Sequence, residues 1–238
     1  GQQMKIKISN VLIEMQERLL GYVSEMSYGY AQLCVKADPS SLLGFEERID
    51  EKKYRMEDMA RVFIHDQKDD DDKIDLYPID PAFITVLITG MFKIHPEFKI
   101  SVEKIDEIEG VEDDDSPQLK FIRLTMPTVT KEYRKTLLTA IDALDYKCKG
   151  RHEQMKVKYT SELMKVCVGE KPEAIDEAKD VMEGLMKQYD DIRVKLTTQK
   201  KEEVENAFQR YLREKAKEDG VNRDADGNPI GSTLKMEE

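Results

Sequence analysis

The most constraining feature of this sequence is a change of hydrophobic period that occurs twice along the chain. Before Leu43 and again after Pro127, apolar residues recur every three or four positions, which is the spacing of one face of an α-helix. Between these two points the apolar runs are short, β-branched or aromatic, and separated by charged turns, which indicates strands. This pattern predicts long helices interrupted by one small α+β module.

Three segments carry the helical pattern, at residues 10–36, 130–168 and 173–218. Asn10 is the expected N-cap of the first helix. Asp38 and Pro39 are expected to end it, because the residue before a proline is disfavoured in the α region. Each helix has one apolar stripe that needs a partner, so the three helices are predicted to pack together as a bundle.

The predicted fold class is α+β, with the smaller domain inserted between the first two helices. Residues 1–43 and 125–219 are expected to form the three-helix bundle, and residues 44–124 the inserted α+β domain with one short helix that begins at Pro81. Residues 220–238 are polar and are expected to be a flexible tail. The acidic runs at 69–72 and 112–115 are expected to be solvated loops, since nothing in the sequence shows the convergent oxygens of a calcium site.

Charge is unevenly distributed along the chain. The net charge is −11, yet the segment 130–168 contains nine Lys/Arg and five Asp/Glu. A basic helix in an acidic protein favours a binding surface for RNA, although a solvated face balanced by acidic neighbours would have the same composition. The candidate RNA-contacting residues are Arg134, Lys135, Lys147, Lys149, Arg151, Lys156 and Lys158.

No sequence signature of catalysis is present. Phosphate-binding loops, nucleophile elbows, zinc-protease motifs and dinucleotide fingerprints are all missing from the sequence, so no enzyme, metal or cofactor is expected. The three cysteines are widely spaced, which favours buried thiols in a reducing compartment over disulfides. The three cysteines are Cys34, Cys148 and Cys167. The three histidines, which form none of these motifs, are His65, His95 and His152.

Three blocks of the chain resemble the ribosome recycling factor family, within a similarity that runs from about residue 10 to residue 208. Residues 122–135, IRLTMPTVTKEYRK, are similar to the family pattern Ile-Arg-Val-x-x-Pro-x-x-Thr-x-Glu-Arg-Arg-Lys. Residues 36–43, KADPSSLL, resemble its Arg-Ala-Ser-Pro-x-Leu-Leu exit from the first helix, with one extra residue. Residues 73–81, KIDLYPIDP, resemble its strand followed by a helix that begins with proline.

The resemblance implies an L-shaped protein of tRNA-like outline whose bundle binds large-subunit rRNA. It also implies that the second domain swings on two hinge strands. A translocase GTPase of the elongation factor G type would be the partner in splitting post-termination ribosomes, and the free protein would be a monomer without membrane contact. The expected hinge residues are Ala37, Asp38, Pro39, Ser40, Ser41, Thr125, Met126, Pro127 and Thr128.

The sequence departs from the family pattern in its arginine-rich patch. Lys156 aligns with the key arginine, while Glu153 and Val157 replace two neighbouring arginines, and Leu33-Cys34-Val35 replaces Arg-Thr-Gly. Lysine keeps the charge of arginine but loses its planar fork. Three readings therefore remain: a diverged organellar recycling factor, a structural or assembly component of a mitochondrial ribosome, or a helical adaptor that binds protein only.

The expected location is the mitochondrial matrix. The chain does not begin with Met, so we expect that a leader was removed from it. A cytoplasmic location or another organelle is the alternative.

Overall fold

The computed structural model describes residues 2–42, 44–66, 70–105 and 119–231. The chain forms two compact units: residues 1–33 and 133–205 make unit 1, and residues 34–132 and 206–238 make unit 2. These limits differ from the expected domain limits at 43/44 and 124/125, because the segments that flank the sheet belong to unit 2.

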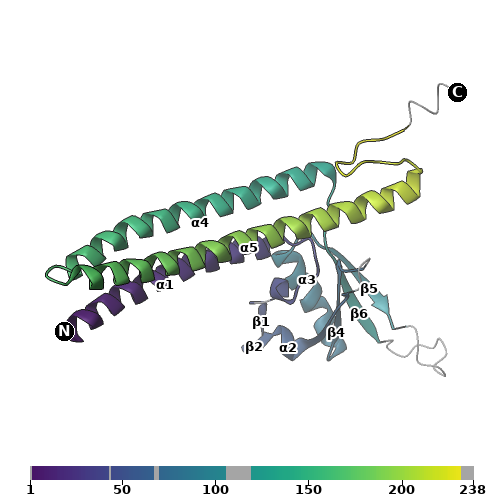
Figure 1. The fold of residues 1–238 in the computed structure, drawn as a ribbon. Coiled ribbons are helices and arrows are strands. Elements are labelled where there is room, and N and C mark those ends of the chain that lie inside the picture. The colour runs from purple at the N-terminus through teal and green to yellow at the C-terminus, as the bar shows by residue number, and fades with distance from the viewer. Residues whose placement is uncertain (1, 43, 67–69, 106–118, 232–238) are drawn as a thin grey trace. The chain divides into compact units, whose positions relative to one another are not determined.

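Unit 1 is built from three long helices that run side by side (Figure 1). They are α1 (Gln2–Gln32), α4 (Lys131–Val166) and α5 (Pro172–Asp219). Only residues 172–205 of α5 belong to unit 1. A turn with Gly169 at φ +87° separates α4 from α5, and Pro172 begins α5 where its missing N–H costs little.

The apolar stripes of the three helices meet as predicted. Leu19 of α1, Ile141 of α4 and Val204 of α5 are fully buried. Between the helices, the hydroxyl groups of Tyr30 and Thr197 form a hydrogen bond of 2.8 Å. The expected limits of the first helix are wrong, because α1 already begins at Gln2 and ends at Gln32, where we expected residues 10 and 36.

Unit 2 contains a two-stranded hairpin and a four-stranded antiparallel sheet. The hairpin pairs β1 (Glu46–Ile49) with β2 (Lys52–Arg55), and the short helix α2 (Met56–Met59) follows it. The sheet has the order β3-β4-β6-β5, formed by β3 (Ala60–Ile64), β4 (Lys73–Pro78), β6 (Lys120–Thr125) and β5 (Lys99–Lys104). Two 3₁₀ turns, Pro39–Leu42 and Pro81–Phe83, complete the unit, the second leading into α3 (Ile84–Ile94).

The core of unit 2 lies on one face of the four-stranded sheet. Ile74 of β4 and Ile122 of β6 are fully buried there, in one cluster with Leu87 and Met91 of α3. Alternation along each strand places the neighbouring residues on the opposite face. This arrangement confirms the predicted α+β fold class.

The end of the described chain folds back on the last turns of α5. Gly227 lies so close to Phe208 and Leu212 that a Cβ atom there would be 3.3 Å from both side chains. Asp224 accepts backbone N–H groups from Asp226 and Asn228. Residues 221–231, which we expected to be part of a flexible tail, therefore have defined contacts in unit 2. Residues 232–238 and the acidic run 112–115 lie outside the described residues.

Among the described residues, no helix combines the length and the apolar character that a membrane crossing requires.

Candidate RNA-binding surface

One row of cations on α4 lies toward α5. Lys135, Lys149 and Lys156 are exposed. Together with Asp142 they follow one another at intervals of seven residues, so all four lie along one side of the helix. Asp142 forms a 2.8 Å ion pair with Lys201 of α5, which identifies that side. Within the described part of the chain, the three lysines make no ion pair. We call Lys135, Lys149 and Lys156 the α5-side row.

A second row of cations lies on the α1 side of the same helix. Lys147, Arg151 and Lys158 are spaced by four and seven residues, and we call them the α1-side row. Lys147 Nζ is 3.1 Å from Glu25 of α1, and Arg151 pairs with the same carboxylate and lies over the Tyr22 ring. The hydrogen bond from Lys147, helped by the charge of Arg151 and opposed by partial desolvation, lowers the pKa of Glu25.

The face of α4 between the two rows is mostly uncharged. Tyr146 and Val157 are 80% and 74% exposed, and they share this face with residues that have small side chains. Glu132 and Glu153, in the same register of seven residues as Tyr146, are its acidic residues. The small residues on this face are Thr139, Ala143 and Gly150. Since an α-helix with its side chains is about 10 Å wide, the two rows can reach separate phosphates on either side of the face.

Arg134 does not belong to either row. It lies seven residues before the buried Ile141, which places it on the inward side of α4. Its guanidinium group is 2.7 Å from Glu205 of α5. Of the seven candidate residues, six thus line the outer face of α4 in two rows, and one takes part in a contact within the bundle.

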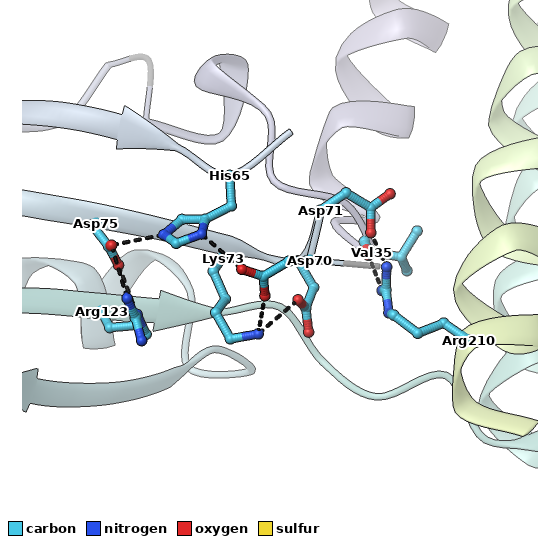
Figure 2. A network of polar contacts seen from close by, with 9 residues as sticks. Val35, His65, Asp70, Asp71, Lys73, Asp75, Arg123 and Arg210 are labelled. Atoms are coloured by element: carbon cyan, nitrogen blue, oxygen red, sulfur yellow. Dashed lines mark hydrogen bonds and ion pairs between the residues drawn. The ribbon is translucent and has the colours of Figure 1, made fainter. Parts of the chain in front are cut away.

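Unit 2 holds its charges in a network on the outer face of the sheet (Figure 2). The centre is Asp75 of β4, which is only 2% exposed. Arg123 of β6 donates two hydrogen bonds to its carboxylate, from Nε at 2.9 Å and from a terminal nitrogen at 3.1 Å. Burial opposes ionisation of Asp75, but the hydrogen bonds and charges of Arg123 and His65 outweigh it and hold the pKa of Asp75 below its ordinary value.

His65 connects Asp75 to the acidic run. Its Nε2 is 2.7 Å from Asp75 and its Nδ1 is 2.8 Å from Asp70, so a doubly protonated ring would donate to both carboxylates. Asp70 also forms an ion pair with Lys73, and Asp72 lies 3.2 Å from the same ammonium group. The prediction of a solvated loop is therefore wrong for Asp70–Asp72.

Asp71 anchors the last turns of α5 to the loop. Its carboxylate pairs with Arg210, which also donates to the carbonyl of Val35 at 3.4 Å (Figure 2). The backbone carbonyl of Asp71 accepts the N–H of Ala37 at 2.7 Å, and that of Asp72 accepts the N–H of Met126 at the same distance. Asp71 and Asp72 are thus part of a structural junction of unit 2.

The residues expected to form a hinge all lie inside unit 2. Ala37 and Met126 are buried in its apolar core. The carbonyl of the buried Ser41 lies 2.6 Å from His95 Nε2, and the Ser41 hydroxyl donates to the carbonyl of Asp38 at 2.6 Å. The two segments, 37–41 and 125–128, belong to unit 2 and lie within a few residues of its limits at Cys34 and Glu132, and their role as hinges stays a prediction.

Sequence reasoning missed this network because its members are far apart in the chain. Asp75 and Arg123 are separated by 48 residues, and Asp71 and Arg210 by 139. One signal was available: Asp75 stands between two strongly apolar residues in a predicted strand, and a charge in that position needs a partner if the sheet buries it. The partner became visible only through the β4–β6 register, which pairs Asp75 with Arg123.

The described residues contain no cluster of three or more His, Cys, Asp or Glu side chains that could hold a metal ion.

Comparison with known proteins gives a likeness of fold. No protein-family model matches the sequence, and no curated protein matches it. Among solved structures, the chain is similar to a solution structure of the ribosome recycling factor, with a TM-score of 0.63 and 14% sequence identity. The match covers 83% of this chain and 97% of that chain. The protein therefore has a fold like that of the ribosome recycling factor.

Proposed function

We propose that this protein is a ribosome-binding translation factor that contacts large-subunit rRNA through the outer face of α4. In this proposal it acts with a translocase GTPase of the elongation factor G type to split post-termination ribosomes, without catalysis by its own residues. The observation that carries the proposal is the pair of cationic rows on either side of a mostly uncharged helical face. The recycling-factor-like fold supports it.

The arrangement suits RNA for an electrostatic reason. Each lysine or arginine that neutralises a phosphate releases a condensed counterion, so two rows of cations give strong, salt-dependent binding without reading the base sequence. The face between the rows is mostly uncharged, so it opposes the approach of the RNA backbone only weakly. Tyr146, on this face, offers a ring on which an unpaired base can stack.

A second candidate is a structural or assembly component of a mitochondrial ribosome, derived from a recycling factor. Two exposed residues of α4 favour it. Glu153 and Val157 stand at positions where the resemblance places arginines, and neither can bind a phosphate. Both candidates place the protein on the ribosome, and location in the mitochondrial matrix is part of the proposal.

Sedimentation of the purified protein with ribosomes at increasing salt tests the proposal. The variant Lys156→Glu/Lys158→Glu changes one residue in each row and should weaken binding and flatten its salt dependence. The matched control is Lys187→Glu/Lys195→Glu on α5, which changes the charge equally at exposed positions of the same bundle and should bind as the wild type does.

Three outcomes separate the candidates. Binding that depends on α4, together with splitting of post-termination ribosomes by protein and cognate translocase, supports a recycling factor. Binding that depends on α4 without splitting favours the structural component. If the wild-type protein does not sediment with ribosomes at low salt, both are wrong and the protein-only adaptor replaces them.

A further inference from the structure

The outward face of α1 carries an apolar stripe that no part of unit 1 covers. Ile6, Ile13 and Leu20 are 59%, 53% and 51% exposed and lie seven residues apart, so they point the same way. The buried residues of α1, such as Met15 and Leu19, lie on the opposite side of the helix. Large apolar side chains in an ordered row on a solvent face indicate an interaction surface.

The same face is poor in charge. Asn10 and Glu17 lie between the three apolar residues and Ser24 follows them, so Glu17 is the one charged residue in this row. Charged residues make up 37% of the whole chain, and their depletion is typical of the centre of a protein interface. In α1 as a whole, three Lys/Arg balance three Glu, so this helix adds no repulsion between two copies of a chain with net charge −11.

We propose that this stripe pairs with the same stripe of a second copy, with the two α1 helices antiparallel. Ile6 and Leu20 are equally far from Ile13, at seven residues on either side. A two-fold axis at Ile13 therefore brings Ile13 against its own equivalent and Ile6 against Leu20 of the second copy. This self-complementary pattern is what a two-fold symmetric interface requires.

The polar residues of the stripe distinguish the two possible directions. In the antiparallel pair, Glu17 of one copy lies level with Ser9 and Asn10 of the other, whose hydroxyl and amide groups can donate to its carboxylate. In a parallel pair, Glu17 would face Glu17 of the second copy, and two like charges would repel each other. The chemistry of the stripe thus favours the antiparallel direction.

The contact is built from one helix of each copy, so it is small and should dissociate at low protein concentration. The protein is then a monomer when dilute, as the family resemblance implies, and a dimer when concentrated. The stripe and the two cationic rows are on different helices, so this inference stands or falls independently of the proposed RNA-binding function.

Sedimentation velocity over a wide concentration range tests for the dimer. The weight-average mass of the wild type should rise toward twice the mass of the chain, and Ile13→Glu should remain monomeric because each dimer would bury two opposed carboxylates. Val181→Glu is the matched control, since Val181 is 47% exposed on α5 and its change adds the same charge outside the stripe. Thermal unfolding of both variants should match the wild type, because neither side chain lies in the core.

Cysteine cross-linking tests the direction. Ile13→Cys should form a disulfide-linked dimer under mild oxidation, and so should an equimolar mixture of Ile6→Cys and Leu20→Cys. Leu20→Cys alone should not, because fourteen residues along the axis separate the two thiols by about 21 Å in an antiparallel pair. The native cysteines are buried, and burial raises the pKa of the Cys148 thiol to about 11, so they do not compete.

The proposal is overturned by a wild-type protein that stays monomeric at every concentration, or by a Val181→Glu control that dissociates as fully as Ile13→Glu. Equal cross-linking of Leu20→Cys alone and Ile13→Cys alone would contradict the antiparallel arrangement.

Discussion

The helical bundle and the α+β unit use their charged residues in opposite ways. In unit 2, Arg123, Lys73 and Arg210 each pair with a carboxylate of the acidic run or of β4. In unit 1, the α5-side row of α4 has no carboxylate partner within the described chain. These cations of unit 2 hold its own loops and strands, whereas the three lysines of the α5-side row are available to an external anion.

Burial explains this difference. Asp75 is almost fully buried, and a buried charge without a partner costs several kcal/mol, so its surroundings must supply counter-charges. An exposed lysine on a helix surface remains hydrated and gains at most about 1 kcal/mol from an ion pair. Net charge alone therefore does not locate a binding site. Under the proposed function, unit 1 recognises RNA, and the charge network of unit 2 has a structural role.

The largest effect is expected on RNA affinity, when charge reversals in the two rows of α4 are compared. Lys149→Glu/Lys156→Glu should lower the affinity for large-subunit rRNA at least about tenfold and reduce the salt slope by about two. Lys147→Glu/Lys158→Glu should have a smaller effect, because Lys147 is already paired with Glu25. Fluorescence anisotropy at several salt concentrations measures both. Equal losses in the two variants would show that the ion pair with Glu25 does not withhold Lys147 from RNA.

The next effect concerns stability and should be confined to unit 2. Asp75→Asn removes the acceptor charge of Arg123 and His65 and should lower the free energy of unfolding by about 2–3 kcal/mol. Urea denaturation measures it, with Glu103→Gln on β5, the edge strand beyond β6, as the control, which should change stability by less than about 0.5 kcal/mol. RNA affinity should not change. A loss of RNA affinity in a folded Asp75→Asn variant would contradict the proposal that the two units have separate roles.

A smaller, local effect is expected at the junction of Asp71 with Arg210. Arg210→Gln removes the charge that holds the Asp71 carboxylate, so the loop should open more often. The amides of Ala37 and Met126 bond to this loop, and their hydrogen exchange should accelerate about tenfold, which corresponds to about 1.4 kcal/mol. Exchange in α4 should be unaffected. Unchanged exchange at both amides would mean that the backbone bonds do not depend on the ion pair.

The smallest effect should appear in the pH dependence of stability. Burial lowers the pKa of His152, despite its hydrogen bond to the Leu19 carbonyl, and among the described residues its Nδ1 finds no hydrogen-bond partner. The unfolded chain therefore takes up a proton near pH 6.5 that the folded protein does not, and stability falls as the pH drops below that value. His152→Leu should flatten this part of the profile, as measured by urea denaturation between pH 7 and pH 5. If the slope of stability against pH is unchanged in this variant, groups other than His152 cause the decline.

Asp75 should act at lower pH in the same profile. Its pKa is depressed in the folded state, so its contribution is complete above the unfolded pKa of about 3.9 and is lost as the pH falls through the folded value. The Asp75→Asn variant should lack this second decline, which separates the contribution of unit 2 from that of the bundle.

The long elements of this fold could be predicted from sequence because their stripes are regular over many turns. Residues 130–168 and 173–218 agree with α4 and α5 to within one or two residues. The start of α1 was misplaced because Asn10, a favourable N-cap, lies within a helix whose stripe continues to Met4 through half-buried Ile8. Capping preference is a local effect, and packing in the bundle outweighed it.

The candidate surface was only partly predictable. The spacing of the lysines identified α4 as basic, but the sequence could not show that Arg134 pairs with Glu205 or that Lys147 pairs with Glu25, since these partners come from other helices. The acidic run was misread for the same reason. Asp71 and Asp72 are fixed by backbone groups of Ala37 and Met126, which are distant in sequence and meet them only in the folded unit.

Protection of lysines from acetylation on the ribosome tests whether the outer face of α4 binds RNA. The reactivity of each lysine would be compared by mass spectrometry in the free and the ribosome-bound protein. We expect Lys149 and Lys156 to become protected, whereas Lys187 and Lys195 of α5 keep their reactivity. Bound protein in which Lys149 and Lys156 react as fast as in the free protein would show that the outer face of α4 is not the RNA-binding surface.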